Sequence, residues 1–249
     1  MRASGLIFFL FPLIMHSQDD LPYKEGERFE FDISYGGIMV GSAEMEILSQ
    51  ETLNKTPVFH IVAKGKTARF FDLFFKVRDV YETYLDTQHI RPVKFIRDIR
   101  EGEYKKKQLY NFNHLEGLVF SKNTSYSISS KTQDMLSAFF YARTFNKKNL
   151  TQKKAFFIPI FMDEEIYSLE ILHLYNEKIK TKFGNIECMV FKPKMQQGRV
   201  FEDGEQMKIW ISNDKNRLLV KVETKILVGT IKAFLVDYKK LKYPLSISK

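Results

Sequence analysis

The chain has 249 residues, of which 44% are hydrophobic and 14% aromatic, with only 12 Gly and 7 Pro. This composition excludes wholesale disorder and the collagen-like and low-complexity classes. There are 39 Lys and Arg against 30 Asp and Glu, a formal net charge of +9, and the single Cys excludes an intramolecular disulfide framework or a CxxC metal site.

The first predicted element is a secretory signal. Arg2 precedes a short apolar run over residues 6–15, and the small residue Ser17 follows that run. The run is about half as long as a helix that crosses a bilayer. We therefore expect a signal peptide over 1–17, cleaved near Ser17 or Gln18, and a periplasmic or secreted protein that is not an integral membrane protein after cleavage. An uncleaved membrane anchor is the alternative.

After the signal, the sequence alternates with a period of two residues, which is typical of β-strands. Phe29, Phe31 and Ile33 alternate with polar residues before a turn at 36–37, and the pattern resumes after it. Further strands are predicted over about 57–66, 74–85, 91–100, 103–112, 116–121, 155–161, 165–174, 176–182, 186–193, 205–212, 217–226 and 229–238.

One segment departs from the strand pattern. Residues 134–145 space their apolar side chains as a helix does, and Thr132 or Asp134 is placed to cap its start. About a dozen strands in one flat sheet would be unfavourable, so the sheet is expected to curl, close or split. The sequence predicts an all-β, mainly antiparallel fold, a strongly curved sheet or incomplete β-barrel with one short helix near 134–145.

The division into domains follows from the same pattern. We expect residues 18–249 to form a single β domain, and the basic, linker-like stretch 147–154 is where a split into two lobes would fall. An outer-membrane barrel is not expected, because outward strand positions carry charges such as Arg28 and Glu30.

Charged residues interrupt two otherwise apolar strand faces. Asp79 lies among Phe75, Val77 and Tyr81, and Arg97 interrupts the apolar face of the next strand. A hairpin loop over 86–90 would place Asp79 opposite Arg97.

The next hairpin would bring two more polar side chains to this face. A turn at 101–102 would place Arg97 opposite Lys106 and would set Gln108 opposite Phe95. Polar groups on a concave, aromatic-lined face are how β-barrel binders orient a ligand. The sequence-based ligand-contact set is Asp79, Tyr81, Arg97, Lys106, Gln108, Ser137, Tyr141 and Arg143. The alternative for Asp79 and Arg97 is a buried salt bridge with a purely structural role. The alternative for Asp134 is that it acts only as a helix cap.

Several stretches, taken in order, resemble one known family. They are 26–38 with Gly41, 77–83, 95–102, 133–143 and 210–214. The chain resembles the DUF3108 proteins, exported bacterial proteins of unknown function, over about 25–238. The resemblance implies export and a β-rich fold, and it implies no reaction. It includes Asp79, Arg97, Asp134, Ser137, Tyr141 and Arg143, while Thr83 stands where the family pattern suggests Ser.

Three functions are compatible with the sequence. The leading hypothesis is non-enzymatic binding of a lipid-like or glycan component of the envelope inside a curled sheet. The alternatives are a carbohydrate-active enzyme using inward carboxylates and tyrosines, and a structural partner of an outer-membrane complex. The four His residues that follow the predicted signal peptide have no metal-ligand spacing, and they suggest no metal and no cofactor. Nucleic acid is not an expected partner of an exported protein, and the sequence does not indicate an oligomeric state or a catalytic residue.

Overall fold

The alternating sequences of the first half fold into eight consecutive antiparallel strands, each paired with the next. In the first strand Phe29 and Phe31 are buried while Asp32 is exposed, as the period of two residues requires. The strands are β1 (Arg28–Tyr35), β2 (Ile38–Leu53), β3 (Thr56–Thr67), β4 (Arg78–Asp86), β5 (Pro92–Glu101), β6 (Tyr104–Asn113), β7 (Leu118–Ser121) and β8 (Thr124–Ser127).

The second half adds six strands to the same sheet. They are β9 (Phe156–Met162), β10 (Glu165–Thr181), β11 (Gly184–Gln196), β12 (Gln206–Ser212), β13 (Leu219–Lys225) and β14 (Thr230–Lys239). Because β14 pairs with β1, the order runs β8-β7-β6-β5-β4-β3-β2-β1-β14-β13-β12-β11-β10-β9. The predicted antiparallel all-β class is confirmed.

The computed structural model describes residues 21–145, 150, 155–196, 206–226 and 229–248. The predicted signal peptide and nearly all of 147–154 lie outside these ranges, so cleavage and the division into domains stay predictions. No helix among the described residues has the length and apolar character that a membrane crossing requires.

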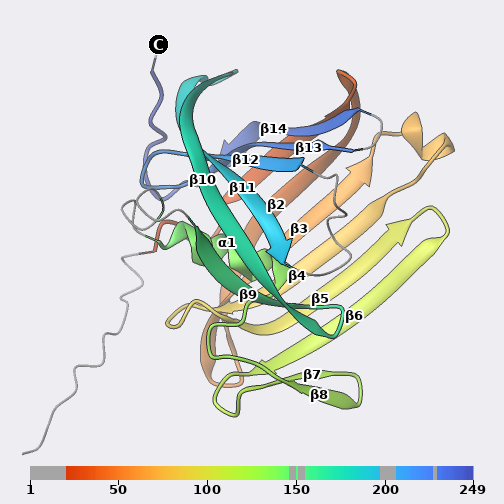
Figure 1. Ribbon diagram of the computed structural model, residues 1–249, viewed down its shortest axis with the longest axis vertical. Helices are drawn as coiled ribbons and strands as arrows, with labels where there is room; N and C mark the ends of the chain where they lie inside the picture. The colour runs from red at the N-terminus through yellow and green to blue at the C-terminus, as the bar shows by residue number, and fades with distance from the viewer. Residues whose placement is uncertain (1–20, 146–149, 151–154, 197–205, 227–228, 249) are drawn as a thin grey trace, which may run out of the picture.

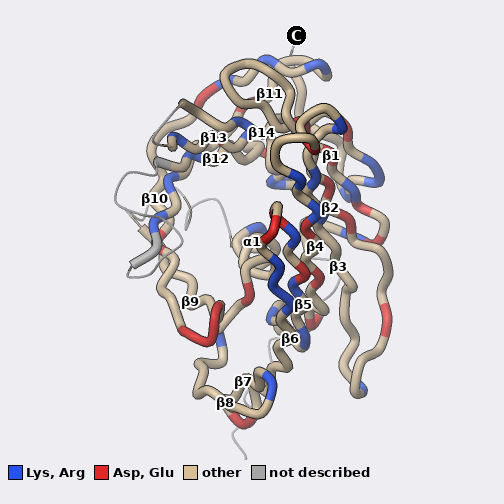
Figure 2. Tube along the Cα trace, turned by 90° about the vertical axis from the view of Figure 1, so that its right-hand side faces the viewer, with Lys and Arg blue, Asp and Glu red and all other residues tan. Residues whose placement is uncertain are grey.

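The 14-stranded sheet curls so that its two ends approach each other around α1 (Met135–Arg143). Figure 2 shows β9 and β10 on one side of the molecule and β3 to β6 on the other, with α1 between them. In the described part of the chain no ladder joins β8 to β9. Instead Gln133 pairs with the β9 edge, donating from its N to Pro159 O at 2.8 Å and accepting from Phe161 N at 2.8 Å. The fold is an incomplete barrel, as predicted.

Helix α1 fills the space inside the curl. Its side chains enter two apolar clusters, Leu136 and Phe140 with the β2–β6 side, and Ala138 with the β9–β12 side. Asp134 caps the helix by accepting from the N–H groups of Leu136 at 2.8 Å and Ser137 at 2.7 Å. The predicted capping residue is therefore Asp134, and the interior is occupied by the helix.

Local departures from the prediction occur where turns intervene. The strand expected from 74 begins at Arg78, and Phe71–Leu73 form a short 3-10 helix, η2. Phe75, predicted to face inward, is 55% exposed. The two strands expected over 165–182 are one strand, β10, which contains a bulge between His173 and Tyr175, and β8 was not predicted.

Candidate functional site

The predicted pairing of Asp79 with Arg97 is wrong by two residues. In the observed register Arg97 lies opposite Tyr81 on β4 and opposite Gln108 on β6. Because the shift is even, the polar side chains stay on the predicted face of the sheet. Lys106 lies opposite Ile99 and not opposite Arg97.

Arg97 forms an ion pair with Asp163, which lies beside the last strand in the sheet order. Its Nη1 lies 3.1 Å from Oδ1 of Asp163, in the turn between β9 and β10, and 3.2 Å from Oε1 of Gln108. Lys106 Nζ also bonds Asp163, and Gln108 Nε2 donates to it at 3.1 Å. Burial alone would raise the pKa of Asp163, but the bonds from Lys106 and Gln108 and the charge of Arg97 hold that pKa below its ordinary value.

Thus three predicted residues do meet, around a carboxylate that the sequence analysis missed. Ser121 on β7 extends the contact by donating from Oγ to Glu164 at 3.0 Å. Asp163 and Glu164 have φ values of 50° and 63°, a left-handed turn in which glycine or asparagine would be less strained. We interpret this cluster as a latch that holds the β9–β10 hairpin against β5, β6 and β7. The latch consists of Arg97, Lys106, Gln108, Ser121, Asp163 and Glu164.

Asp79 has a different environment. It is buried, and its Oδ1 accepts from the backbone N of Arg100 at 3.0 Å. Burial raises the pKa of Glu101, and the nearby charge of Asp79 and a side-chain hydrogen bond between these two carboxyl groups raise it further.

The predicted residues of α1 do not join the latch. Ser137 completes the helix cap, since its Oγ accepts from Asp134 N at 2.8 Å. Tyr141 is half-buried, and its ring packs edge-on against Phe145 at a centroid distance of 4.9 Å. Arg143 instead bonds Glu27, just before β1, and Asn216, in the loop after β12.

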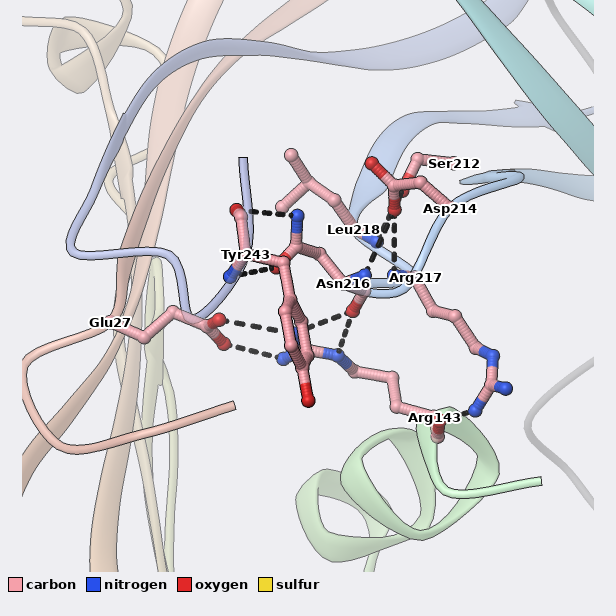
Figure 3. Close-up of polar contacts among 8 residues, drawn as sticks. All are labelled: Glu27, Arg143, Ser212, Asp214, Asn216, Arg217, Leu218 and Tyr243. Carbon is pink, nitrogen blue, oxygen red and sulfur yellow. Dashed lines mark hydrogen bonds and ion pairs between the residues drawn. The ribbon is translucent and has the colours of Figure 1, made fainter. Parts of the chain in front are cut away.

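Figure 3 shows the surroundings of Arg143. Its guanidinium binds Glu27 through two bonds of 2.6 and 3.1 Å, and both side chains are at most 1% exposed. Nε and Nη2 also donate to the backbone oxygen of Asn216, at 3.1 and 2.9 Å. This arrangement leaves no guanidinium nitrogen of Arg143 for a ligand, so Arg143 is satisfied by the fold itself.

The loop after β12 is shaped by side-chain to backbone bonds. Asp214 Oδ1 accepts from the N–H groups of Asn216 at 3.0 Å and Arg217 at 3.1 Å, while Ser212 Oγ accepts from Leu218 N at 2.7 Å. Arg217 takes a left-handed backbone with φ of 50°. The loop thereby presents the Arg217 side chain toward the end of α1, where its Nη1 donates to the backbone oxygen of Arg143.

Unlike Arg143, Arg217 has no carboxylate partner within the described residues, because none lies within 4.0 Å of its guanidinium. The side chain is half-buried; burial and the charge of Arg143 lower the pKa of Arg217, and Asp214 acts in the opposite direction. An anion that approached this guanidinium would relieve the unfavourable desolvation of its charge.

A narrow apolar slot lies beside Arg217, between α1 and the inner face of β9 to β12. Its empty space is about 370 Å³ counted to the open mouth, of which only about 40 Å³ is wide enough for the centre of a water molecule. Apart from the two arginines at positions 143 and 217, its walls are apolar. They are Phe139, Ala142, Leu150, Phe156, Ile171, Phe191, Ile209 and Ile211.

The sequence held weak signals for part of this site. The turn at 213–216 was predicted, and the stretch 210–214 carried part of the family resemblance, but neither indicated that Arg217 turns inward. Glu27 lies in the family-resembling stretch 26–38 but was not predicted as a site residue, and Asp163 carried no signal. Each meets its partner only through the curl of the sheet. Among the described residues no group of three or more His, Cys, Asp or Glu side chains is placed to hold a metal ion.

A family model described as "Protein of unknown function (DUF3108)" matches residues 30–236. The chain belongs to the DUF3108 family. The latch, the Arg143 centre and the apolar slot all lie at least partly within the matched region, although Glu27 precedes it. No curated protein matches this DUF3108 chain.

Solved structures extend the comparison of the fold. A β-barrel-like protein of the DUF1849 domain family from Brucella abortus superposes with a TM-score of 0.61 at 8% identity, covering 90% of the DUF3108 chain and 100% of the other. Two weaker matches each cover 88% of this chain and 98% of theirs. A candidate lipoprotein from Parabacteroides distasonis gives 0.42 at 13% identity, and a candidate exported protein with a YmcC-like fold from Bacteroides fragilis gives 0.39 at 11%. The first match shows a shared β-barrel-like fold.

Proposed function

We propose that this protein is an exported, non-enzymatic binder of a lipid-like ligand. The apolar run over 6–15, placed after Arg2, supports export. The single observation that carries the binding proposal is the apolar slot with Arg217 at its side. In this arrangement an acyl chain lies between α1 and β9 to β12, and its anionic head group pairs with the guanidinium.

The shape and chemistry of the slot favour a lipid over a glycan. Sugar rings are wide and need several hydrogen-bonding partners, whereas the slot is narrow and its walls between Phe139 and Ile211 offer none. A single alkyl chain is thin and gains free energy from apolar burial alone. An unpaired, half-buried guanidinium adds selectivity for a carboxylate or phosphate head.

Octanoate and its uncharged analogue, 1-octanol, provide the test, because the small slot suits a short chain. Wild-type protein, delipidated and titrated by calorimetry, is expected to bind octanoate saturably. Arg217→Gln is expected to weaken octanoate binding about tenfold, the effect of one partly buried ion pair, and to leave the alcohol almost unaffected. Lys215→Gln is the matched control, because Lys215 lies two residues away and is exposed.

A second variant tests the apolar walls independently of charge. Ala142→Leu adds three carbon atoms to the slot and is expected to lower the affinity for both ligands equally. The proposal fails if wild-type protein binds neither ligand saturably, or if Arg217→Gln and Lys215→Gln lose the same affinity. Thermal unfolding of each variant separates loss of binding from loss of fold.

A further inference from the structure

The loop between β3 and β4 exposes an unusual number of large apolar side chains. We define the aromatic loop as residues 68–76, which include η2. Phe70 is 66% exposed, Leu73 81%, Phe74 75% and Phe75 55%. Isolated exposed apolar residues are common, but four within six positions form a patch of the kind that marks an interaction surface.

The aromatic loop is held in one conformation by polar contacts at its base. Asp72 accepts from Arg78 at 3.0 and 2.6 Å and from Thr67 Oγ1 at 2.5 Å. The bond from Arg78 is the main reason that the pKa of Asp72 falls to about 2. Thr67 Oγ1 in turn accepts from Val77 N at 3.0 Å. The loop therefore holds its Phe side chains exposed to solvent, and they can contact a partner without a rearrangement of the loop.

Neighbouring hairpins extend this apolar surface. Ala68 N donates to Val40 O at 2.9 Å, which ties the aromatic loop to the tip of the β1–β2 hairpin. In Figure 1 these hairpin tips lie along the upper right of the molecule. Half of the large apolar side chains exposed in the described chain belong to this end of the sheet. They are Tyr35, Ile38, Met39, Phe70, Leu73, Phe74, Phe75, Tyr104 and Ile231.

Charge decides which partner suits this surface. Arg69 and Lys76 lie within the aromatic loop and Lys66 lies just before it, and all three side chains are exposed. Its one acidic residue, Asp72, is already paired with Arg78. Figure 2 faces this end and shows the Lys and Arg segments in blue. Exposed aromatic rings beside these three cations, on a protein of formal charge +9, complement a bilayer surface that carries anionic lipids.

We propose that the aromatic loop docks the protein onto an anionic lipid bilayer, with Phe70, Leu73, Phe74 and Phe75 inserted among the lipid head groups. Lys66, Arg69 and Lys76 then contact lipid phosphates at the rim. This surface is separate from the apolar slot, so docking and ligand binding can be tested and can fail independently.

Flotation with two kinds of vesicle tests the proposal. One kind contains phosphatidylglycerol and phosphatidylethanolamine, and the other replaces phosphatidylglycerol with phosphatidylcholine. Protein recovered from the cell envelope is expected to float with the anionic vesicles and to be released by high salt. Leu73→Ser/Phe74→Ser is expected to reduce the bound fraction at least about tenfold, because two exposed apolar side chains no longer enter the bilayer.

Two further variants separate the contributions. Arg69→Gln/Lys76→Gln is expected to reduce binding to anionic vesicles several-fold and to abolish their advantage over neutral ones. Leu115→Ser/Phe157→Ser is the matched control, because these side chains are 93% and 54% exposed outside the aromatic loop. Arg217→Gln is expected to dock as wild type.

Three results would overturn membrane docking. The first is a wild-type protein that does not float with anionic vesicles. The second is an equal loss in the aromatic-loop variant and the Leu115→Ser/Phe157→Ser control. The third is a wild-type dimer that the Leu73→Ser/Phe74→Ser variant converts to monomer without changing flotation, which would assign the surface to a second copy of the chain.

Discussion

One guanidinium near the centre of the molecule joins three distant parts of the chain. Arg143, at the end of α1, bonds Glu27 before β1 and the backbone oxygen of Asn216 after β12. Its carbon Cζ also lies 5.0–5.5 Å from the centroids of four aromatic rings. The rings belong to Tyr23, Phe29, Phe139 and Phe140. Sequence reasoning selected Arg143 as a ligand contact, whereas its observed partners give it a structural role.

Removing the cation from this centre should be severe. Arg143→Met leaves the Glu27 carboxylate buried without its partner, and we expect the free energy of unfolding to fall by about 3–5 kcal/mol in urea denaturation. The double variant Arg143→Met/Glu27→Leu leaves no charge buried at this centre and should recover at least half of that loss. A single variant within about 1 kcal/mol of wild type, or no recovery in the double variant, would contradict this account.

At the level of elements, strand faces could be predicted and register could not. Leu85 pairs with Pro92 and not with Arg91 as assumed, and a bulge that leaves Val93 unpaired adds one more residue of shift. Arg97 therefore lies opposite Tyr81 and not Asp79. The β5–β6 turn occupies 102–103 and not 101–102, which shifts that pairing by two as well. Both shifts are even, so inward residues stay inward. A period of two residues fixes the face, but register depends on turn conformations that composition does not specify.

The helix was predictable for a similar local reason. Its apolar spacing and a nearby Asp are properties of about ten consecutive residues, and α1 begins where they indicate. Its environment was not predictable, since Thr83 on β4 meets Asp134 only in the folded molecule, donating to it at 2.6 Å. The Asp134 carboxyl group is therefore fully buried, and burial shifts its pKa.

The buried cap should make stability depend on pH. Burial raises the pKa of Asp134 from 3.8 to about 6, although bonds from Thr83, Ser137 and Leu136 oppose this shift. The folded protein then binds the proton more tightly than the unfolded chain does. The contribution of protonated Asp134 to the free energy of unfolding is fully present below about pH 4 and is lost as pH rises through 6. The full difference is about 3 kcal/mol.

The variant Asp134→Asn isolates this effect because it keeps a capping oxygen and cannot ionise. Denaturation curves at pH 4 and pH 7 should show wild type losing about 2 kcal/mol more than the variant, because the unfolded carboxyl is already partly ionised at pH 4. Subtracting the pH-dependent change of the variant from that of wild type removes the contribution of the carboxyl groups that both proteins share. Parallel pH profiles for the two proteins would show that the buried carboxyl keeps an ordinary pKa.

For the whole molecule, the central question is what keeps a 14-stranded sheet curled without closing. Helix α1 fills the interior, Gln133 pairs with the β9 edge, and the latch joins Asp163 to Arg97 across the open side. These contacts link residues far apart in sequence and at opposite ends of the sheet order. Alternation in the sequence indicated curling, but it could not identify which turn would meet which strand, because that depends on the twist accumulated over all the strands.

The latch should control how readily the β9–β10 hairpin separates from β5 to β7. Asp163→Asn keeps the size of the side chain and suits the left-handed turn, but it removes the charge that Arg97 and Lys106 share. We expect amide hydrogen exchange in β9 and β10 to become about five- to tenfold faster, which corresponds to roughly 1 kcal/mol. Asp98→Asn is the control, since Asp98 pairs with the exposed Arg100.

Acid should act on the latch in the same direction as this substitution. The pKa of Asp163 lies below its ordinary value, so the ion pair contributes fully above about pH 4 and is lost as pH falls through the lowered pKa. On acidification, exchange in β9 and β10, corrected for the intrinsic pH effect, should therefore accelerate more in wild type than in Asp163→Asn, which shares all other titrating groups. If the variant and wild type exchange alike at neutral pH, α1 and Gln133 hold the curl without the latch, and the strained acidic turn needs another explanation.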